Sequence, residues 1–207
     1  MRAESSCRAA DQLDSIAAVR TFTIADTKVL QRSARSELPI YLYACGETYF
    51  KAKRFPQALP YFRRLTRDFK GTRVARRAEA RLISTEVGII RRGRTNPLPA
   101  PAPIGTAPHG EVDLIVRNSS PYPLELLLAG ETPRRFTIRA CDNCVTFVEG
   151  SEPAGCPPGP ERTFIVTPGS YAAVVRSPGK SVTPWSGDWA LTGGRQYGHC
   201  FFIVRSH

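Results

Sequence analysis

Long apolar runs and the common catalytic motifs are missing from this sequence. No stretch approaches the roughly 20 apolar residues that a membrane-spanning helix requires. The first residues, MRAESSCRAADQLDS, contain no apolar segment of the kind found in secretory signals, so we expect none here. Only three histidines are present, and GxSxG, HExxH and phosphate-loop motifs are lacking. We therefore expect no transmembrane segment, no enzymatic activity and no cofactor.

Positive charge is abundant, and it is concentrated in one segment. The whole chain has a formal net charge of +11. Between Lys51 and Arg94, fourteen lysines and arginines accompany three acids, which leaves the same excess of +11 in this segment alone. The remainder is neutral on balance, so the chain divides into a basic first half and a balanced second half.

The hydrophobic period also changes along the chain, and the change predicts an α+β protein of two domains. Apolar residues recur with helical spacing in the first half and alternate, as in strands, in the second. Five prolines lie in the stretch between the two halves. We expect a helical domain over 1–94, a proline-rich linker in extended polyproline conformation over 95–110, and an antiparallel β-sandwich over 111–207.

Three apolar rows with helical spacing dominate the first half, after weaker helical patterns at 7–21 and 24–34. Pro56 separates the first row from the second, because proline fits the first turn of a helix but not its interior. Gly71 and Thr72 can end the second helix and cap the third. The first row consists of Leu38, Tyr41, Leu42, Cys45 and Tyr49.

The first two of these helices resemble a tetratricopeptide repeat. The residues at the family's characteristic positions are Leu42, Gly46, Tyr49, Ala58 and Phe62. Gly46 and Ala58 are small enough to let two antiparallel helices approach, while the rings of Tyr49 and Phe62 fill the space between them. The sequence departs from the family at Leu65, where a small residue is usual, and it lacks the closing proline.

This resemblance, over 42–83, implies a scaffold that binds a protein or peptide in a concave helical groove without catalysis. Its candidate protein-binding residues are Tyr41, Tyr49 and Phe62. The alternative is that a single repeat only packs on its neighbours and supports the second domain. The order of repeat, proline-rich segment and cysteine-bearing β domain is also similar to that of uncharacterised actinobacterial repeat proteins, which implies an architecture and no established activity.

Arginines follow the second and third helical rows at intervals of four residues, which places them in two neighbouring stripes. They are Arg63, Arg67, Arg73, Arg77 and Arg81. Such stripes can bind an anionic polymer, such as a cell-wall polymer, an anionic lipid surface or nucleic acid, or they can simply be a solvated face. Nucleic-acid binders usually add stacking aromatic residues or a reading motif, and these arginines have neither, so we do not expect nucleic acid as the partner.

Four cysteines lie in the predicted β domain, and they predict two disulfides. Cys144 and Cys156 flank a Gly/Pro-rich excursion, so we expect them to pair and Cys141 to pair with Cys200. Zinc is an alternative, with His199 as a further ligand, although a second CxxC is lacking. Free thiols are the third possibility, and we expect no metal.

The cysteines also bear on location and partner. Disulfides form in oxidising compartments, so we expect an extracytoplasmic or cell-surface protein. The alternative is a cytoplasmic protein with reduced thiols. In either place the expected partner is an unidentified protein or peptide.

Two tryptophans, Trp185 and Trp189, lie four residues apart near the end of the chain. Together they could form an aromatic platform for a carbohydrate. Packing in a core or a loop is the commoner role of tryptophan, and both interpretations stay open at this point.

Overall fold

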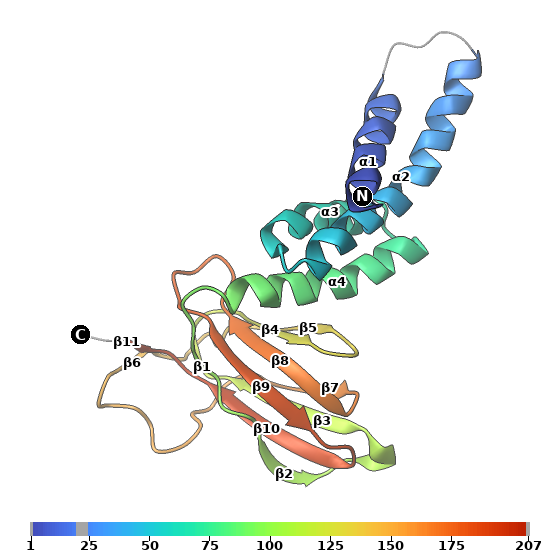
Figure 1. Cartoon of the computed structure of the whole chain (residues 1–207). Helices are drawn as coiled ribbons and strands as arrows, with labels where there is room; N and C mark the ends of the chain where they lie inside the picture. Colours follow the sequence, from blue (N-terminus) through green and yellow to red (C-terminus); the bar gives the residue numbers. More distant parts are fainter. Residues whose placement is uncertain (1, 20–24, 206–207) are drawn as a thin grey trace. The chain divides into compact units, whose positions relative to one another are not determined.

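The computed structural model describes residues 2–19 and 25–205 and confirms an α+β protein. The chain divides into two compact units, Met1–Ile89 and Ile90–His207 (Figure 1). Helices make up the first unit, and the second is built mainly of strands. No helix in the described ranges is long and apolar enough to cross a membrane.

Four helices form the first unit: α1 (Arg2–Ala18), α2 (Ala25–Lys51), α3 (Phe55–Asp68) and α4 (Arg73–Ile90). Helix α2 begins well before the apolar row that predicts it and continues through Pro39. This early part of α2 contacts α1, where Arg35 donates a hydrogen bond to the carbonyl of Ala17 at 3.3 Å. A disulfide joins Cys7 of α1 to Cys45 of α2. The weak helical patterns at the start of the chain thus form a hairpin that is cross-linked to the better-predicted part.

The turns between the helices follow the expected signals. Pro56 lies in the first turn of α3. Gly71 has φ +81°, and the hydroxyl of Thr72 accepts a hydrogen bond from the amide of Ala75 at 3.1 Å, so Thr72 caps α4. After α2 the left-handed residue is Lys53, at φ 57°, where glycine is more usual.

Close approach of α2 and α3 depends on two small residues. A Cβ atom added to Gly46 would lie 2.8 Å from Cε1 of Phe62, so a side chain here would displace the ring. Ala58 is 0% exposed and belongs to the same buried cluster as Phe62. The other buried members of the cluster are Ala10, Leu38, Leu42, Leu65 and Ala78.

The second unit contains a five-stranded sheet in the order β1-β9-β8-β4-β5, a four-stranded sheet in the order β2-β10-β3-β7, and a two-stranded pair, β11-β6. The strands of the five-stranded sheet are β1 (Asn96–Pro97), β9 (Trp185–Leu191), β8 (Gly169–Arg176), β4 (Leu124–Ala129) and β5 (Arg134–Ile138). Those of the four-stranded sheet are β2 (Ala102–Thr106), β10 (Arg195–Phe201), β3 (Val112–Asn118) and β7 (Glu161–Val166). The short pair consists of β6 (Phe147–Val148) and β11 (Val204–Arg205).

Most strand pairs are antiparallel, as expected, but three are parallel: β1 with β9, β10 with β3, and β11 with β6. The two larger sheets share one hydrophobic core. Alternation explains this arrangement, since Val112, Leu114 and Val116 of β3 are fully buried while the residues between them are only partly so. Leu126 of β4 and Trp189 of β9 enter the same core from the other sheet.

The proline-rich segment differs from the expected free linker, because it supplies strands β1 and β2 of the second unit. Asn96 donates its backbone N–H to Pro184 at 2.8 Å and Leu98 donates to Ser186 at 2.9 Å. Successive N–H groups of a strand point to opposite sides, so prolines at every second position remove donors only from the side away from β9. Leu98 is 5% exposed and joins the core. Proline at every second position favours an extended spacer, and it is therefore also compatible with an edge strand.

Substitution of Ala58 by leucine tests the packing of α2 against α3. We expect Ala58→Leu to lower the free energy of unfolding of the helical unit by about 1 to 3 kcal/mol, because no space exists for the added atoms. Gln57→Leu is the matched control, since Gln57 is exposed on the same helix. Thermal unfolding followed by circular dichroism measures both, and equal melting temperatures for the two variants would contradict the close approach.

Candidate functional site

Aromatic and basic side chains meet on one face between α2 and α4. Tyr43, Glu47 and Phe50 are spaced by four and three residues along α2, so they share a side of the helix. The guanidinium carbon of Arg77 lies 5.0 Å from the centroid of the Tyr43 ring, and that of Arg81 lies 4.8 Å from the Phe50 ring. Nε of Arg81 is also 2.5 Å from Oε1 of Glu47. We call these five residues the α2–α4 face.

The three predicted protein-binding residues are not part of this face, although the Phe62 ring lies beneath it, with centroids 5.9 Å from Tyr43 and 6.4 Å from Phe50. Phe62 is 0% exposed, so it cannot contact a partner, and this prediction is wrong. Its ring belongs to the core because it fills the space above Gly46. Tyr41 and Tyr49 are partly buried against the same core, and the Tyr49 ring stacks on Tyr61 with centroids 5.9 Å apart. These three residues pack within or against the core that holds the helices together.

The signal for the α2–α4 face was present in the sequence but outside the apolar rows. Tyr43, Glu47 and Phe50 form a row of their own at spacings of four and three, on a different side of α2 from Tyr41 and Tyr49. Its partners are two of the predicted arginines. Arg77 and Arg81, which the sequence predicts only as part of a basic stripe, therefore also contact aromatic rings.

The five predicted anion-binding arginines lie on α3 and α4, but most have partners. Arg63 contacts Glu86 at 3.5 Å, and Arg67 contacts its neighbour Asp68 at 2.6 Å. The hydrogen bond from Arg67 lowers the pKa of Asp68, so this acid stays ionised beside it. Arg81 and Arg77 belong to the α2–α4 face. Within the described part of the chain, Arg73 and Arg77 have no ion pair or hydrogen bond, and Arg77 contacts only the ring of Tyr43.

All six cysteines are paired, but not as predicted. The bridges are Cys7–Cys45, Cys141–Cys144 and Cys156–Cys200. The expected oxidation is confirmed, whereas the predicted pairs Cys144–Cys156 and Cys141–Cys200 are wrong. The sulfurs are held in disulfides, so they are not available as the thiolates that the zinc alternative requires.

A tight turn explains the first of the two bridges in the β unit. The amide of Cys144 donates to the carbonyl of Cys141 at 3.4 Å, and the Cα atoms of the two residues are 5.3 Å apart. Cys156 is thereby left for Cys200 of β10, with a Cα separation of 5.9 Å. No disulfide therefore joins the two ends of the Gly/Pro-rich segment between Cys144 and Cys156. Each end belongs to a different disulfide.

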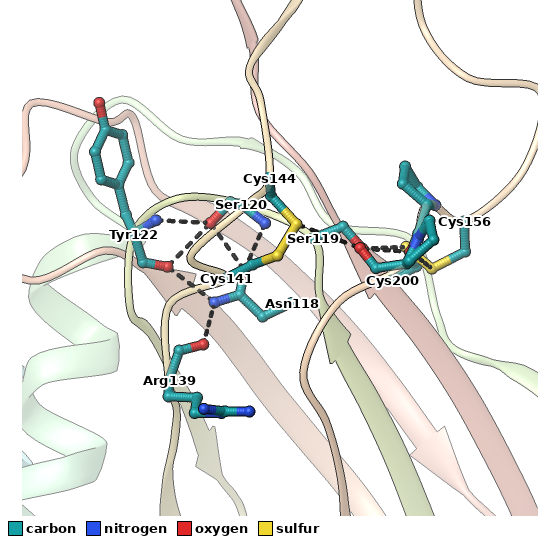
Figure 2. The surroundings of a disulfide bond; sticks show 11 residues. Asn118, Ser119, Ser120, Tyr122, Arg139, Cys141, Cys144, Cys156 and Cys200 are labelled. Atoms are coloured by element: carbon teal, nitrogen blue, oxygen red, sulfur yellow. Dashed lines mark hydrogen bonds between the residues drawn. A yellow bond between two sulfur atoms is a disulfide. The ribbon is translucent and has the colours of Figure 1, made fainter.

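Buried polar groups connect these two bridges (Figure 2). The side-chain amide of Asn118, at the end of β3, donates to the carbonyls of Tyr122 and Arg139, both at 2.8 Å. Its oxygen accepts from the hydroxyl of Ser120 at 2.8 Å, and the carbonyl of Ser120 accepts from the amide of Cys141 at 2.9 Å. Both the nitrogen and the oxygen of the Asn118 side chain therefore have hydrogen-bond partners, as buried polar groups require. We assign this network a structural role.

His199 of β10 and the two tryptophans of β9 lie near Phe201 in the second unit. Trp189 is 1% exposed, and its indole N–H donates to the carbonyl of Pro99 at 3.0 Å. It therefore cannot belong to a carbohydrate platform. Trp185 is only partly buried. The His199 ring lies 4.5 Å from Phe201 and 5.6 Å from Trp189, and burial lowers the pKa of His199 to about 4, so it is neutral at pH 7.

Searches against protein-family models, curated proteins and solved structures give no match to this chain.

Removal of each bridge of the β unit by paired Cys→Ser substitutions should have unequal effects. The separations are 44 residues for Cys156–Cys200 and 3 for Cys141–Cys144. Chain entropy predicts losses of about 4 and about 2 kcal/mol respectively, because a longer loop restricts the unfolded chain more. Denaturant unfolding followed by tryptophan fluorescence measures this, since both tryptophans lie in the β unit. A larger loss for Cys141/Cys144 would contradict the assignment, and non-reducing peptide mapping tests the pairing directly.

Acid should destabilise the β unit partly through His199. The unfolded chain takes up this proton near pH 6.5, while the folded protein resists it until about pH 4. Stability from the neutral ring is therefore complete above pH 6.5 and is lost as the pH falls toward 4, by up to about 3 kcal/mol. Urea unfolding of the wild type and His199→Gln at pH 7, 5 and 4 isolates this effect from the carboxylates. Parallel pH dependences of the two proteins would show that the ring does not resist protonation.

Proposed function

We propose that the chain is a non-enzymatic protein-interaction adaptor. Its helical unit is a tetratricopeptide-like repeat capped by α1, and its second unit is a disulfide-stapled β-sandwich. The close approach at Gly46 and the buried Ala58 support the repeat, because these are the small positions that the family requires. The shared core of the two larger sheets supports the sandwich.

The α2–α4 face is the observation that carries the proposal. Tyrosine and arginine are enriched among the residues that dominate binding energy in protein interfaces. Here both types lie on one face, and cation–π contacts and the Arg81–Glu47 ion pair hold the side chains in place before any partner arrives. Side chains that are already ordered lose less conformational entropy on binding. Ile40, which is 60% exposed on the same helix, adds apolar surface.

An extracytoplasmic or cell-surface location forms part of the proposal. Its support is the pairing of all six cysteines in three disulfides, one in the helical unit and two in the β unit. Persistent structural disulfides are typical of oxidising compartments. A cytoplasmic location would leave these cysteines reduced.

The alternative function, binding of an anionic polymer through the basic stripes, receives less support. Glu86, Asp68 and Glu47 lie beside three of the five arginines, which lowers the positive potential of the surface. Exposed ion pairs are weak, so a polymer with many charges could still displace the acids. The two functions therefore differ in their dependence on salt and on individual arginines.

A peptide-display selection with the whole protein as bait tests the proposal. We expect selected peptides to lose at least about tenfold in affinity on Arg77→Glu, the effect of a contact worth roughly 1.4 kcal/mol. Arg67→Glu is the matched control, because it makes the same change in charge on α3, outside the α2–α4 face. Equal losses of affinity in the two variants would contradict specific peptide binding by the α2–α4 face.

A second arm addresses the anionic polymer. Retention on immobilised dextran sulfate at rising salt is compared between the wild type and a variant with all five arginines reversed. Strong retention that salt and charge reversal abolish, together with no selected peptide, would overturn the adaptor function in favour of the polymer.

A further inference from the structure

A hollow of about 360 Å³ in the β unit is lined by residues of β1, β9 and β10 and by residues that follow β1 and β10 in the chain. Its apolar walls come from the proline-rich segment and from the end of the chain, and they include Leu98, Phe201 and Phe202. The size lies at the lower end of the about 300 to 1,000 Å³ typical of small-molecule sites. The proposed adaptor function does not use this hollow.

Three polar side chains line the hollow without partners of their own. They are the carboxamide of Asn96, the indole N–H of Trp185 and the imidazole of His199. None of them hydrogen-bonds to any residue in the ranges that the structure describes. Trp189 provides the contrast, because its N–H is bonded to Pro99. The two tryptophans therefore have different roles, one in the core and one at an open site.

The hydrogen-bonding groups restrict the chemistry of a ligand. The neutral imidazole provides one donor and one acceptor, the carboxamide provides two donors and an acceptor, and the indole provides a donor. Hydroxyl groups match this mixture, because each can donate and accept. A purely aromatic ligand would bury these groups unpaired, which costs roughly 1 to 3 kcal/mol for each, so it fits the hollow less well.

The electrostatics exclude ligands with a strong charge. Among residues 2–19 and 25–205, no lysine, arginine, aspartate or glutamate lines the hollow, and burial keeps His199 neutral at pH 7. An ion entering this space would lose hydration without gaining a counter-charge. The aromatic lining is apolar instead: Trp185 is partly buried, and its ring centroid lies 6.5 Å from that of the buried Phe201.

We propose that this hollow binds a neutral sugar ring, either as a free monosaccharide or as the end of a glycan chain. The apolar C–H face of the sugar packs on Trp185, and its hydroxyl groups bond to Asn96 and His199. This site is independent of the α2–α4 face, so the same protein can hold a glycan on one unit and a protein partner on the other.

Titration of the whole protein with glucose, galactose, mannose and N-acetylglucosamine, and with short β-linked oligomers of each, tests the site. We expect saturable changes in tryptophan fluorescence, because Trp185 is one of only two tryptophans in the chain. The affinity should change little between low and high salt, since no charge takes part. Free sugars that bind as tightly as the oligomers indicate a monosaccharide site, and tighter binding of the oligomers indicates a glycan end.

Two variants make the result decisive. Asn96→Ala should weaken binding about tenfold, the loss expected for one hydrogen bond worth roughly 1.4 kcal/mol. Trp185→Ala should abolish binding, which isothermal titration calorimetry measures because this variant lacks the fluorescent reporter; Tyr122→Ala is the control, since Tyr122 is a partly buried aromatic residue at the disulfide corner. Should Trp185→Ala fail to fold, Asn96→Ala still decides, since its backbone N–H bond to Pro184 remains.

The proposal is overturned if no sugar of the panel binds saturably, or if binding survives both variants unchanged. Saturable binding of neutral aromatic compounds such as indole, with no sugar bound, would also overturn it. Loss of peptide binding in Arg77→Glu with sugar binding retained would show that the two sites act independently.

Discussion

Hydrogen bonding between the proline-containing strand β1 and its neighbour β9 determines much of the second unit. Asn96 and Leu98 direct their N–H groups to β9, while the prolines between and after them have no donor to leave unpaired on the open side. This pairing brings Leu98 into the core and places the Pro99 carbonyl over the indole of Trp189. A Cβ atom on Gly187 would lie 2.0 Å from the Leu98 carbonyl oxygen, so the approach requires glycine there. The wall of the candidate sugar site follows from the same contact.

The two units hold their exposed functional groups in different ways. In the helical unit, arginines of α4 are fixed by rings and an acid of α2, so the α2–α4 face is charged and already ordered. In the β unit, the described residues that line the hollow carry no charge, and its polar side chains have no hydrogen-bond partner among the described residues. Charged and ordered surfaces favour recognition of another protein, whereas a neutral pocket with unsatisfied groups favours a small polar molecule. The two proposed ligands, a protein and a neutral sugar, differ for this reason.

Local signals in the sequence predicted the elements better than their assembly. Pro56, Gly71 and Thr72 marked helix boundaries because their backbone preferences act on immediate neighbours. Alternation in β3 similarly predicted which residues are buried, since one sheet face must meet the core. The sequence predicts a spacer for the proline-rich segment because no pattern within that segment shows where the backbone N–H groups of Asn96 and Leu98 find their acceptors.

The candidate sites show the same limit. Phe62 stood at a family position that packs helices, and a pattern of spacing cannot separate packing from contact with a partner. Cys144 and Cys156 looked suited to pair because they flank a loop, but the turn at Cys141 brings a nearer sulfur. The hollow of the β unit gathers residues from 96 to 204, so only the folded chain defines it.

The order of the cysteines along the chain has a consequence for biosynthesis. A chain that enters an oxidising compartment from its N-terminus presents Cys7 and Cys45 before the other four cysteines of this sequence, so these four do not compete for the helical bridge. Cys141 and Cys144 emerge next, only three residues apart, and once they are oxidised neither can pair with another cysteine. Cys156 then has a single partner to wait for, Cys200. Each bridge therefore joins two cysteines that follow one another directly in this sequence, an order that favours the native pairs as the chain emerges.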